Sequence, residues 1–281
     1  MSVPSIDVRR EIGMFIRQQR EARRASNFPG LIHRRRHVPH LTQADLAEIA
    51  GVSHALVAQV ENGRYENLNP SILIRLAMAL KLESHQEQYL LNYLQPPNGH
   101  VGSDEEIPDM LRGLVRSSMP NPAMIITPVF DLVHWNENAV RLLGDFDAYP
   151  VDERNIVVQM FLNPVMRERW VAWETYARNI VSAVRMHSSY ATYRDRILRL
   201  VSYVSARDAQ FREWWESDLP KLTPDHVKDF VHPEYGSLHI FQTVGAVLGS
   251  PNHFFLLMTP RDADTEAVFR RLADAEPGSQ A

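Results

Sequence analysis

The sequence predicts a mainly α N-terminal domain of five helices and an α+β C-terminal domain. Three observations support this fold class. Apolar residues recur at helical spacing through residues 8–94, a segment rich in proline, glycine and acidic residues follows Leu94, and short β-like runs flank helical periodicity in the second half. We therefore expect an N-terminal domain over residues 1–94, a linker over 95–107 and a C-terminal domain over 108–281.

Each predicted element of the N-terminal domain has its own signals. Apolar residues at helical spacing predict an amphipathic helix from Val8 to about Ala25. Residues 27–40 then break the period with prolines and a glycine, and are typical of a basic loop. Four short helices follow. Their start signals are Thr42 with Asp45, Ser53, Asn69 before Pro70, and Ser84 with Glu87.

The second half mixes strand and helix periods. Residues 123–127 and 129–135 have the pattern of short strands. Helical periodicity covers residues 136–144, 154–162, 164–187, 194–206 and 208–216. Residues 237–248 and 253–260, joined by Gly-Ser-Pro-Asn, predict a hairpin that closes a sheet. The order of strands, helices and strands favours an α+β domain with a small antiparallel sheet.

The composition excludes several classes of protein and site. With 44% hydrophobic and 23% charged residues, the 281-residue chain has a globular composition. It contains no cysteine, which excludes disulfides, thiolate zinc sites and cysteine nucleophiles. No secretory signal is evident at the N-terminus, and no stretch approaches the roughly 20 apolar residues of a membrane span. We expect a cytoplasmic protein that does not enter the membrane.

Positive charge is concentrated towards the N-terminus. Residues 1–40 contain nine arginines and three acidic residues, a local charge of +6 in a chain whose net charge is −4. This asymmetry indicates a basic module attached to an acidic one. Arginine supplies nearly all the basic groups, which a GC-rich genome explains as readily as phosphate binding does.

Residues 41–80 carry the most informative motif. Leu46, Ala47 and Ile49 are expected to face inward from one short helix, and Val57 and Val60 from the next. Gly51 is expected to form the tight turn between the two helices. The outward residues of the second helix are small or polar and could meet base edges in a major groove. They are Ser53, His54, Ala55, Ala58 and Gln59.

This segment resembles the Xre and phage-repressor helix-turn-helix domains, which share TQ-x-x-LA, a glycine turn, V-S and E-x-G. The resemblance covers roughly residues 8–94 apart from the basic loop, and implies that Arg20 pairs with Glu61 to hold the first helix to the recognition helix. It also implies a set of DNA contacts. Bases would be met by His54, Ala55 and Gln59, and phosphate or backbone by Gln43, Ser53, Asn62 and Arg64. The alternative is a small helical bundle that binds no DNA.

Three consecutive arginines in the basic loop are a further candidate contact. Beside a DNA-binding motif, Arg34, Arg35 and Arg36 are expected to reach the DNA backbone or the minor groove. The alternative is a solvated loop.

Five segments of the second half share their spacing with a known family. They are VHWNENAVRLLGDF, the pair Arg154-Asn155 after Pro150, RERWVAWETYARNIVSAVR, FREWW and VHPEYGSLHI. With this spacing, residues 120–260 resemble the ligand-binding domain of MmyB-like transcription regulators. This PAS-like domain follows an Xre-type helix-turn-helix domain in that family. The resemblance implies an apolar ligand such as a fatty acid.

The C-terminal domain is rich in aromatic and flexible apolar residues that could line a pocket. The candidates are Phe130, Trp135, Met160, Phe161, Trp170 and Trp173. The alternative is that these residues simply fill a core. Arg154 could anchor a carboxylate head group with help from Asn155, or it could cap a neighbouring helix.

Together these patterns predict a DNA-binding transcription regulator whose C-terminal domain senses a fatty-acid-like ligand. We expect a homodimer on a partly palindromic operator in double-stranded DNA. In the first alternative, the C-terminal domain is a protein-interaction or dimerisation module without a small ligand. Because the sequence has no phosphate-binding glycine loop, G-x-S-x-G elbow or HExxH helix, we expect no catalytic residues, cofactor or metal. An enzyme fused to a DNA-binding head remains the other alternative.

Overall fold

The chain forms two compact units of different fold class. The computed structural model describes residues 7–28, 31, 38–65, 68–92, 107–217, 226–247 and 250–274. The first unit holds residues 1–98 with 188–198, and the second holds residues 99–187 and 199–281. The N-terminal end contains helices alone among its described residues, and the second unit combines helices with an antiparallel sheet. The predicted fold class is therefore confirmed. The predicted linker lies almost wholly outside the described residues, so its limits stay predictions.

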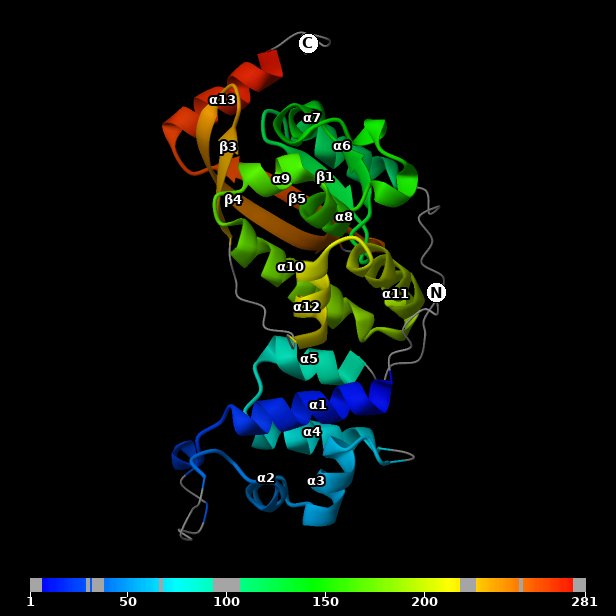
Figure 1. The fold of residues 1–281 in the computed structure, drawn as a ribbon. Coiled ribbons are helices and arrows are strands. Elements are labelled where there is room, and N and C mark those ends of the chain that lie inside the picture. The colour runs from blue at the N-terminus through cyan, green and yellow to red at the C-terminus, as the bar shows by residue number, and fades with distance from the viewer. Residues whose placement is uncertain are drawn as a thin grey trace. The chain divides into compact units, whose positions relative to one another are not determined.

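Within the described part of residues 7–92 the chain forms five α-helices, as predicted (Figure 1). They are α1 Val8–Glu21, α2 Gln43–Ala50, α3 His54–Glu61, α4 Pro70–Ala79 and α5 Ser84–Asn92. Helix α1 ends before the expected Ala25, because the chain turns into extended backbone at Arg24, which forms an isolated β-bridge with His40. A 3-10 turn at Ala25–Asn27 follows that bridge.

Side chains fix both ends of the turn between α2 and α3. Thr42 and Asp45 form a capping box at the start of α2, and Ser53 accepts a hydrogen bond from Leu56 N at the start of α3. Gly51 ends α2 with a φ of 63°, a left-handed conformation that favours glycine. Arg75 of α4 donates to the carbonyl oxygens of Ala50 and Gly51. The last turn of α2 is therefore satisfied from inside the unit.

The core of these helices lies where the motif predicts, with one exception. Leu46, Val57 and Val60 are fully buried. The expected inward position of Ile49 is wrong, since 36% of this residue is exposed. At Gly13, helix α1 passes so close to α3 that an added Cβ would lie 2.5 Å from the carbonyl oxygen of Val60.

The second unit is built on one five-stranded antiparallel sheet with the order β2-β1-β5-β4-β3. The strands are β1 Ala123–Ile126, β2 Leu132–Trp135, β3 Val227–His232, β4 Gly236–Val247 and β5 Ser250–Pro260. The helices that follow residue 107 are α6 Asp109–Ser117, α7 Glu137–Leu143, α8 Ile156–Leu162, α9 Pro164–Arg169, α10 Trp173–Ser188, α11 Ala191–Ser205, α12 Ala209–Ser217 and α13 Ala263–Asp274. Residues 191–198 of α11 are grouped with the first unit. Short 3-10 turns at Phe146–Ala148 and Val151–Glu153 precede α8.

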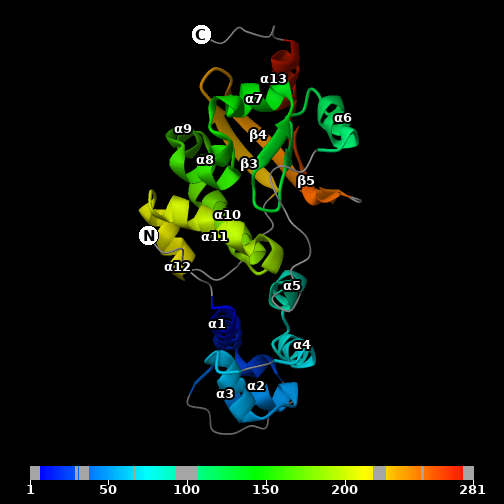
Figure 2. The same ribbon diagram turned by 90° about the vertical axis from the view of Figure 1, so that its right-hand side faces the viewer.

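The two faces of the sheet are covered by different helices, and Figure 2 shows α6 and α8 on opposite sides. Alternation along β1 sends successive side chains to opposite faces. Ala123 and Ile125 pack with Leu111 and Val115 of α6 in one apolar cluster. The other face, with α8, α9 and α10, encloses the cavity described below.

Three features of this unit differ from the prediction. The expected helix over residues 164–187 is interrupted at Trp170, where the backbone is extended, bridges to Phe230 of β3, and is followed by a bond from Val171 N to Asp229 O. Residues 128–130 form a turn and not a strand, with Phe130 at a φ of 69°, and Asp131 makes only an isolated β-bridge with Asn155. Strand β3 and helices α6 and α13 were not predicted, although each carries apolar residues at the spacing of its element.

Candidate functional site

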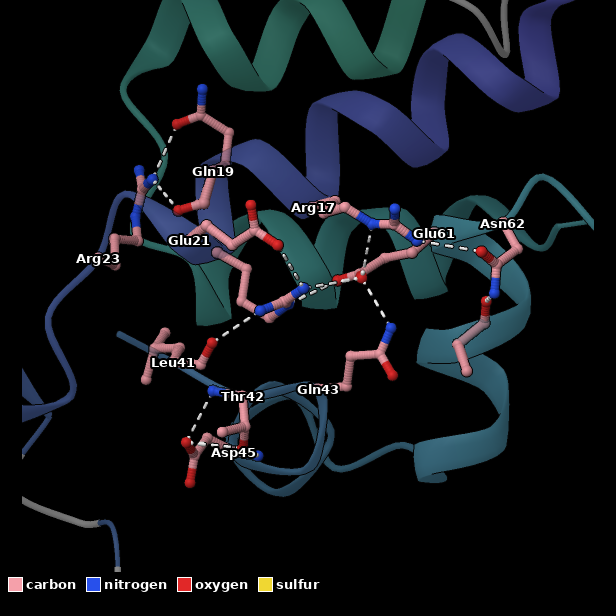
Figure 3. Close-up of polar contacts among 12 residues, drawn as sticks. Arg17, Gln19, Glu21, Arg23, Leu41, Thr42, Gln43, Asp45, Glu61 and Asn62 are labelled. Carbon is pink, nitrogen blue, oxygen red and sulfur yellow. Dashed lines mark hydrogen bonds and ion pairs between the residues drawn. The ribbon is translucent and has the colours of Figure 1, made fainter. Parts of the chain in front are cut away.

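One buried carboxylate joins three helices of the N-terminal unit. Arg20 of α1 donates to Glu61 of α3 through Nε at 2.7 Å and Nη2 at 3.0 Å. Gln43 of α2 donates to the same carboxylate at 2.8 Å, and the Arg17 guanidinium lies 3.5 Å from it (Figure 3). The predicted pairing of Arg20 with Glu61 is confirmed.

The network keeps Glu61 ionised although its side chain is fully buried. Burial by itself would raise the pKa of this carboxyl, but hydrogen bonds from Arg20 and Gln43 and the nearby guanidinium charges outweigh burial and hold the pKa below its usual value. The hydrogen bond to Glu61, with the charges of Glu61 and Glu21, outweighs burial and raises the pKa of Arg20. An ionised, fully bonded carboxylate therefore fixes the orientation of α3 against α1 and α2.

Helix α3 presents one exposed side away from this network. Ser53, His54, Ala55 and Gln59 are exposed, whereas Val57 on the opposite side is fully buried. None of His54, Ala55 and Gln59 makes a side-chain hydrogen bond within the described part of the chain. The surface of α3 is therefore open over the length that a major groove would contact.

Three predicted DNA-contacting residues already have partners inside the unit. The amide nitrogen of Gln43 donates to Glu61, and the Ser53 hydroxyl oxygen accepts from Leu56 N. Asn62 ends α3: its amide donates to Ala58 O, and its Oδ1 accepts from Arg17. These bonds position the side chains but leave the Ser53 hydroxyl proton and a second amide proton of Gln43 and of Asn62 for an acceptor outside the fold.

The remaining predicted DNA contacts lie beyond the end of α3. Arg64 follows Gly63, which has a φ of 65°, and its side chain is exposed. Arg34, Arg35 and Arg36 lie outside the described residues, so their contribution stays a prediction.

The second unit contains an apolar cavity of about 490 Å³. It is enclosed by one face of the sheet, by α8 to α10 and by the turn before β2. Its apolar lining residues are Met124, Ile126, Phe130, Leu132, Leu143, Phe146, Ile156, Met160, Met166, Trp170, Ile180, Ala183, Met186, Val244, Phe254, Leu256 and Met258. Its polar lining residues are Thr127, Gln159, Tyr176, His187 and Gln242.

Two polar contacts lie at different parts of the cavity wall. Near the turn before β2, the His187 Nδ1 lies 2.7 Å from Pro128 O, and the desolvated imidazole has a lowered pKa, so it is neutral at pH 7. Near α9, the Tyr176 hydroxyl donates to Gln242 Oε1 at 2.6 Å. Of the other polar lining residues, Thr127 lies in the turn before β2, and Gln159 donates to Glu153 O and accepts from Asn163.

A family model described as the MmyB-like transcription regulator ligand binding domain matches residues 107–272, more than half of the chain. The chain belongs to the MmyB-like transcription regulators. A helix-turn-helix domain model matches residues 11–90 of the same chain. An MmyB-like regulator with this pair of domains is a DNA-binding transcription regulator with a ligand-binding domain. A search of the curated proteins finds no match.

Three of the eight predicted ligand residues of this MmyB-like domain line its cavity. They are Phe130, Met160 and Trp170. Arg154 does not line it: its guanidinium donates to the carbonyls of Tyr149 and Asp147 and pairs with the Asp147 carboxylate at 2.8 Å. Asn155 is fully buried and caps α8 through Val157 N. Neither group lies at the cavity wall to anchor a head group.

The other predicted ligand residues are part of aromatic packing elsewhere. Phe161 and Trp173 meet edge to face, with centroids 5.6 Å apart, and Trp173 Nε1 donates to Met160 O. Trp135 packs against Phe146, at a centroid distance of 5.2 Å. Packing in the MmyB-like core thus accounts for these three aromatic residues.

The sequence interpretation missed the cavity residues of α10. Tyr176, Ile180, Ala183 and His187 are spaced by four, three and four residues, so they form one stripe along the helix. This spacing was visible in the sequence, but it is equally typical of a helix packed in a solid core. The stripe is recognised as a cavity wall only once the structure shows which face of the sheet lies across from it.

Two further findings concern the described residues only. Among them no helix combines the length and hydropathy needed to cross a membrane. Nor do they contain a group of three or more His, Asp or Glu side chains placed to hold a metal ion.

Proposed function

We propose that this MmyB-like regulator binds an apolar amphiphile, such as a fatty acid, in its C-terminal cavity. The observation that carries the proposal is the cavity of about 490 Å³ with an almost entirely apolar wall. Cavities that hold small ligands span roughly 300–1,000 Å³ and combine apolar walls with a few polar groups.

The chemistry of the wall favours a flexible hydrocarbon ligand. Five methionines line the cavity: Met124, Met160, Met166, Met186 and Met258. Methionine side chains are unbranched and polarizable, so they adapt to chains of differing length and bend. A solid core would leave no such volume, which disfavours the alternative of a protein-interaction module without a ligand.

Native mass spectrometry of the full chain is expected to show a co-purified adduct of a few hundred daltons that is released on unfolding. The substitution Ala183→Phe adds a phenyl group at the cavity wall and is expected to lower adduct occupancy about tenfold, because overpacking costs roughly 1–3 kcal/mol. The matched control Val151→Phe introduces the same side chain at a residue that is 66% exposed, and should leave occupancy unchanged. An adduct-free wild-type protein that takes up no fatty acid would refute the ligand proposal.

We also propose that α3 reads the operator. His54, Ala55 and Gln59 would contact bases, and Gln43, Ser53, Asn62 and Arg64 would contact phosphate or backbone. The exposed side of α3, bounded by the buried Glu61 network, supports this assignment.

Two kinds of substitution should separate base reading from phosphate binding. The double variant His54→Ala/Gln59→Ala should lose about 1–3 kcal/mol of preference for the operator while keeping its affinity for unrelated DNA. Arg64→Ala should weaken binding to all sequences alike and reduce the salt slope by about one unit. Fluorescence anisotropy with operator and scrambled duplexes over a salt series measures both. Unchanged operator preference in the double variant would show that another surface reads the bases.

A homodimer would place two copies of α3 about one DNA turn, roughly 34 Å, apart. In this dimer, the cavity ligand would regulate DNA binding only if it favoured one arrangement of the two helix-turn-helix domains over another. Light scattering after size exclusion, with and without added fatty acid, tests the dimer. A monomer at the concentrations that occupy the operator would exclude it.

A further inference from the structure

We propose that Arg17 of α1 is a further DNA-contacting residue, whose guanidinium binds a backbone phosphate together with the amides of Gln43 and Asn62. The inference rests on the proposed binding of DNA by α3. It adds the charged member of the contact, on a helix to which the sequence motif assigns no DNA contact. The name phosphate triad is used below for Arg17, Gln43 and Asn62.

Arg17 has hydrogen-bond donors left over after its contacts within the fold. Its Nη2 donates to Asn62 Oδ1 at 3.0 Å, and its Nε lies 3.5 Å from Glu61 Oε2. A guanidinium carries five N–H groups and no acceptor, so these two contacts occupy only part of it. The side chain is 45% exposed. Donors at its outer edge are therefore open to an acceptor that approaches from solvent.

The fold gains little from the charge of Arg17. Glu61 is already paired with Arg20 through two shorter hydrogen bonds, at 2.7 and 3.0 Å. Arg17 lowers the pKa of this carboxyl less than Arg20 or Gln43 does. Ion pairs with an exposed partner typically contribute less than about 1 kcal/mol. The charge of Arg17 is therefore available to an anion outside the fold, and is not required to neutralise Glu61.

Glu61 brings the members of the phosphate triad together from three helices. Gln43 of α2 donates to Glu61 Oε2 at 2.8 Å, the same oxygen that Arg17 of α1 approaches. Asn62, at the end of α3, is joined to Arg17 by the bond described above (Figure 3). The Gln43 and Asn62 amides each keep a second N–H beside the guanidinium. A phosphate offers acceptors only, and Arg, Asn and Gln side chains are common phosphate ligands in DNA complexes.

The side of α1 that carries Arg17 has a second exposed arginine. Arg10 and Arg17 are seven residues apart in α1, a spacing that places them on the same side of the helix. A Cβ added to Gly63 would lie 3.1 Å from Arg10 N, so this end of α1 passes beside the turn that ends α3. Arg64 follows that turn, and Arg10, Arg17 and Arg64 are all exposed. A row of positive charge beside α3 is typical of a surface that runs along a DNA strand.

Fluorescence anisotropy of the full chain tests this contact on a labelled duplex of mixed sequence, because phosphate binding needs no operator. The affinity is measured between about 50 and 200 mM salt. Arg17→Gln is expected to reduce the slope of log K against log salt by about 0.9 for each bound chain, the value for one phosphate contact. Its affinity should fall roughly five- to tenfold at about 0.1 M salt. Arg17→Lys keeps the charge and should restore most of the slope.

The matched control is Arg116→Gln, which removes the same charge from an exposed position of α6 in the second unit and should keep the wild-type slope. Thermal unfolding checks that each variant is folded; if Arg17→Gln is not, Arg17→Met decides the question. A purely structural role for Arg17 would lower the melting temperature and leave the slope unchanged.

An unchanged slope in the folded variant, or a slope that Arg17→Lys does not restore, would overturn the assignment of Arg17 and leave the proposed α3 interface standing. A wild-type protein that does not bind the duplex at any of these salt concentrations would overturn both.

Discussion

Replacing Arg20 with methionine is expected to destabilise the helix-turn-helix unit by about 3–5 kcal/mol, because the substitution leaves the Glu61 carboxylate buried without its main partner. Hydrogen exchange of the α1 and α3 amides reports the loss locally, and protection there should fall by about two to three and a half orders of magnitude. Operator binding should fail at temperatures where the unit opens.

Two further variants show that the effect comes from an orphaned charge. Arg24→Met removes an exposed arginine near the end of α1 and should change protection little. The double variant Arg20→Met/Glu61→Leu removes both buried charges and should recover most of the stability, since apolar replacement of a buried ion pair is often neutral or stabilising. A double variant as unstable as the single one would mean that packing, and not charge, explains the loss.

The same carboxylate gives the unit a pH dependence. Contacts with Arg20 and Gln43 hold the pKa of Glu61 below its unfolded-state value of 4.5. The stabilisation is therefore fully present above about pH 4.5 and is lost as the pH falls through the lower folded-state pKa. Amide exchange of α3 between pH 6 and pH 3 should show this loss in the wild type and not in Arg20→Met/Glu61→Leu.

The substitution Gly13→Ala is expected to destabilise the same unit by about 1–3 kcal/mol, the reverse of what helix propensity predicts. In an unconstrained helix, alanine in place of glycine gains roughly 0.5–1 kcal/mol. Here the new Cβ would lie 2.5 Å from Val60 O and 2.7 Å from Glu61 O, so α1 would have to move away from α3. That movement would also lengthen the bonds between Arg20 and Glu61.

Gly113 provides the matched control for this prediction. It lies in α6, and a Cβ added there would have no neighbour within 4 Å. Gly113→Ala should therefore follow propensity and raise the stability of the second unit slightly. Scanning calorimetry of both variants measures whether each substitution lowers or raises the melting temperature. A stabilised Gly13→Ala protein would show that α1 and α3 can separate without cost.

The N-terminal unit was predicted well because its information is local. Capping residues such as Thr42 and Ser53, and Gly51 at the turn, fix each helix end within a few residues of sequence. Ile49 was misplaced because α2 has only eight residues, too few for the period to define which side faces inward. The Arg20 to Glu61 contact spans 41 residues and came from resemblance, not from spacing.

The C-terminal cavity was predicted less completely because it depends on contacts between distant segments. Arg154 and Asn155 have the chemistry of a head-group anchor, yet both satisfy nearby backbone and side-chain groups. Gln242 lies in β4, and its place in the cavity wall follows only from the register between β4 and β5. The break at Trp170 likewise depends on a bridge to Phe230, 60 positions further along the chain.

The exposed side of α3 has one more consequence, for the evolution of new targets. The bonds that stabilise the fold of this unit involve Arg20, Gln43 and Glu61, whereas His54 and Gln59 make no side-chain hydrogen bond among the described residues. Exchanges at such surface positions usually alter folding stability by less than about 0.5 kcal/mol. Mutation can therefore explore different operators at these positions with little risk of unfolding, and descendants of one ancestor could acquire separate regulons while keeping the same ligand.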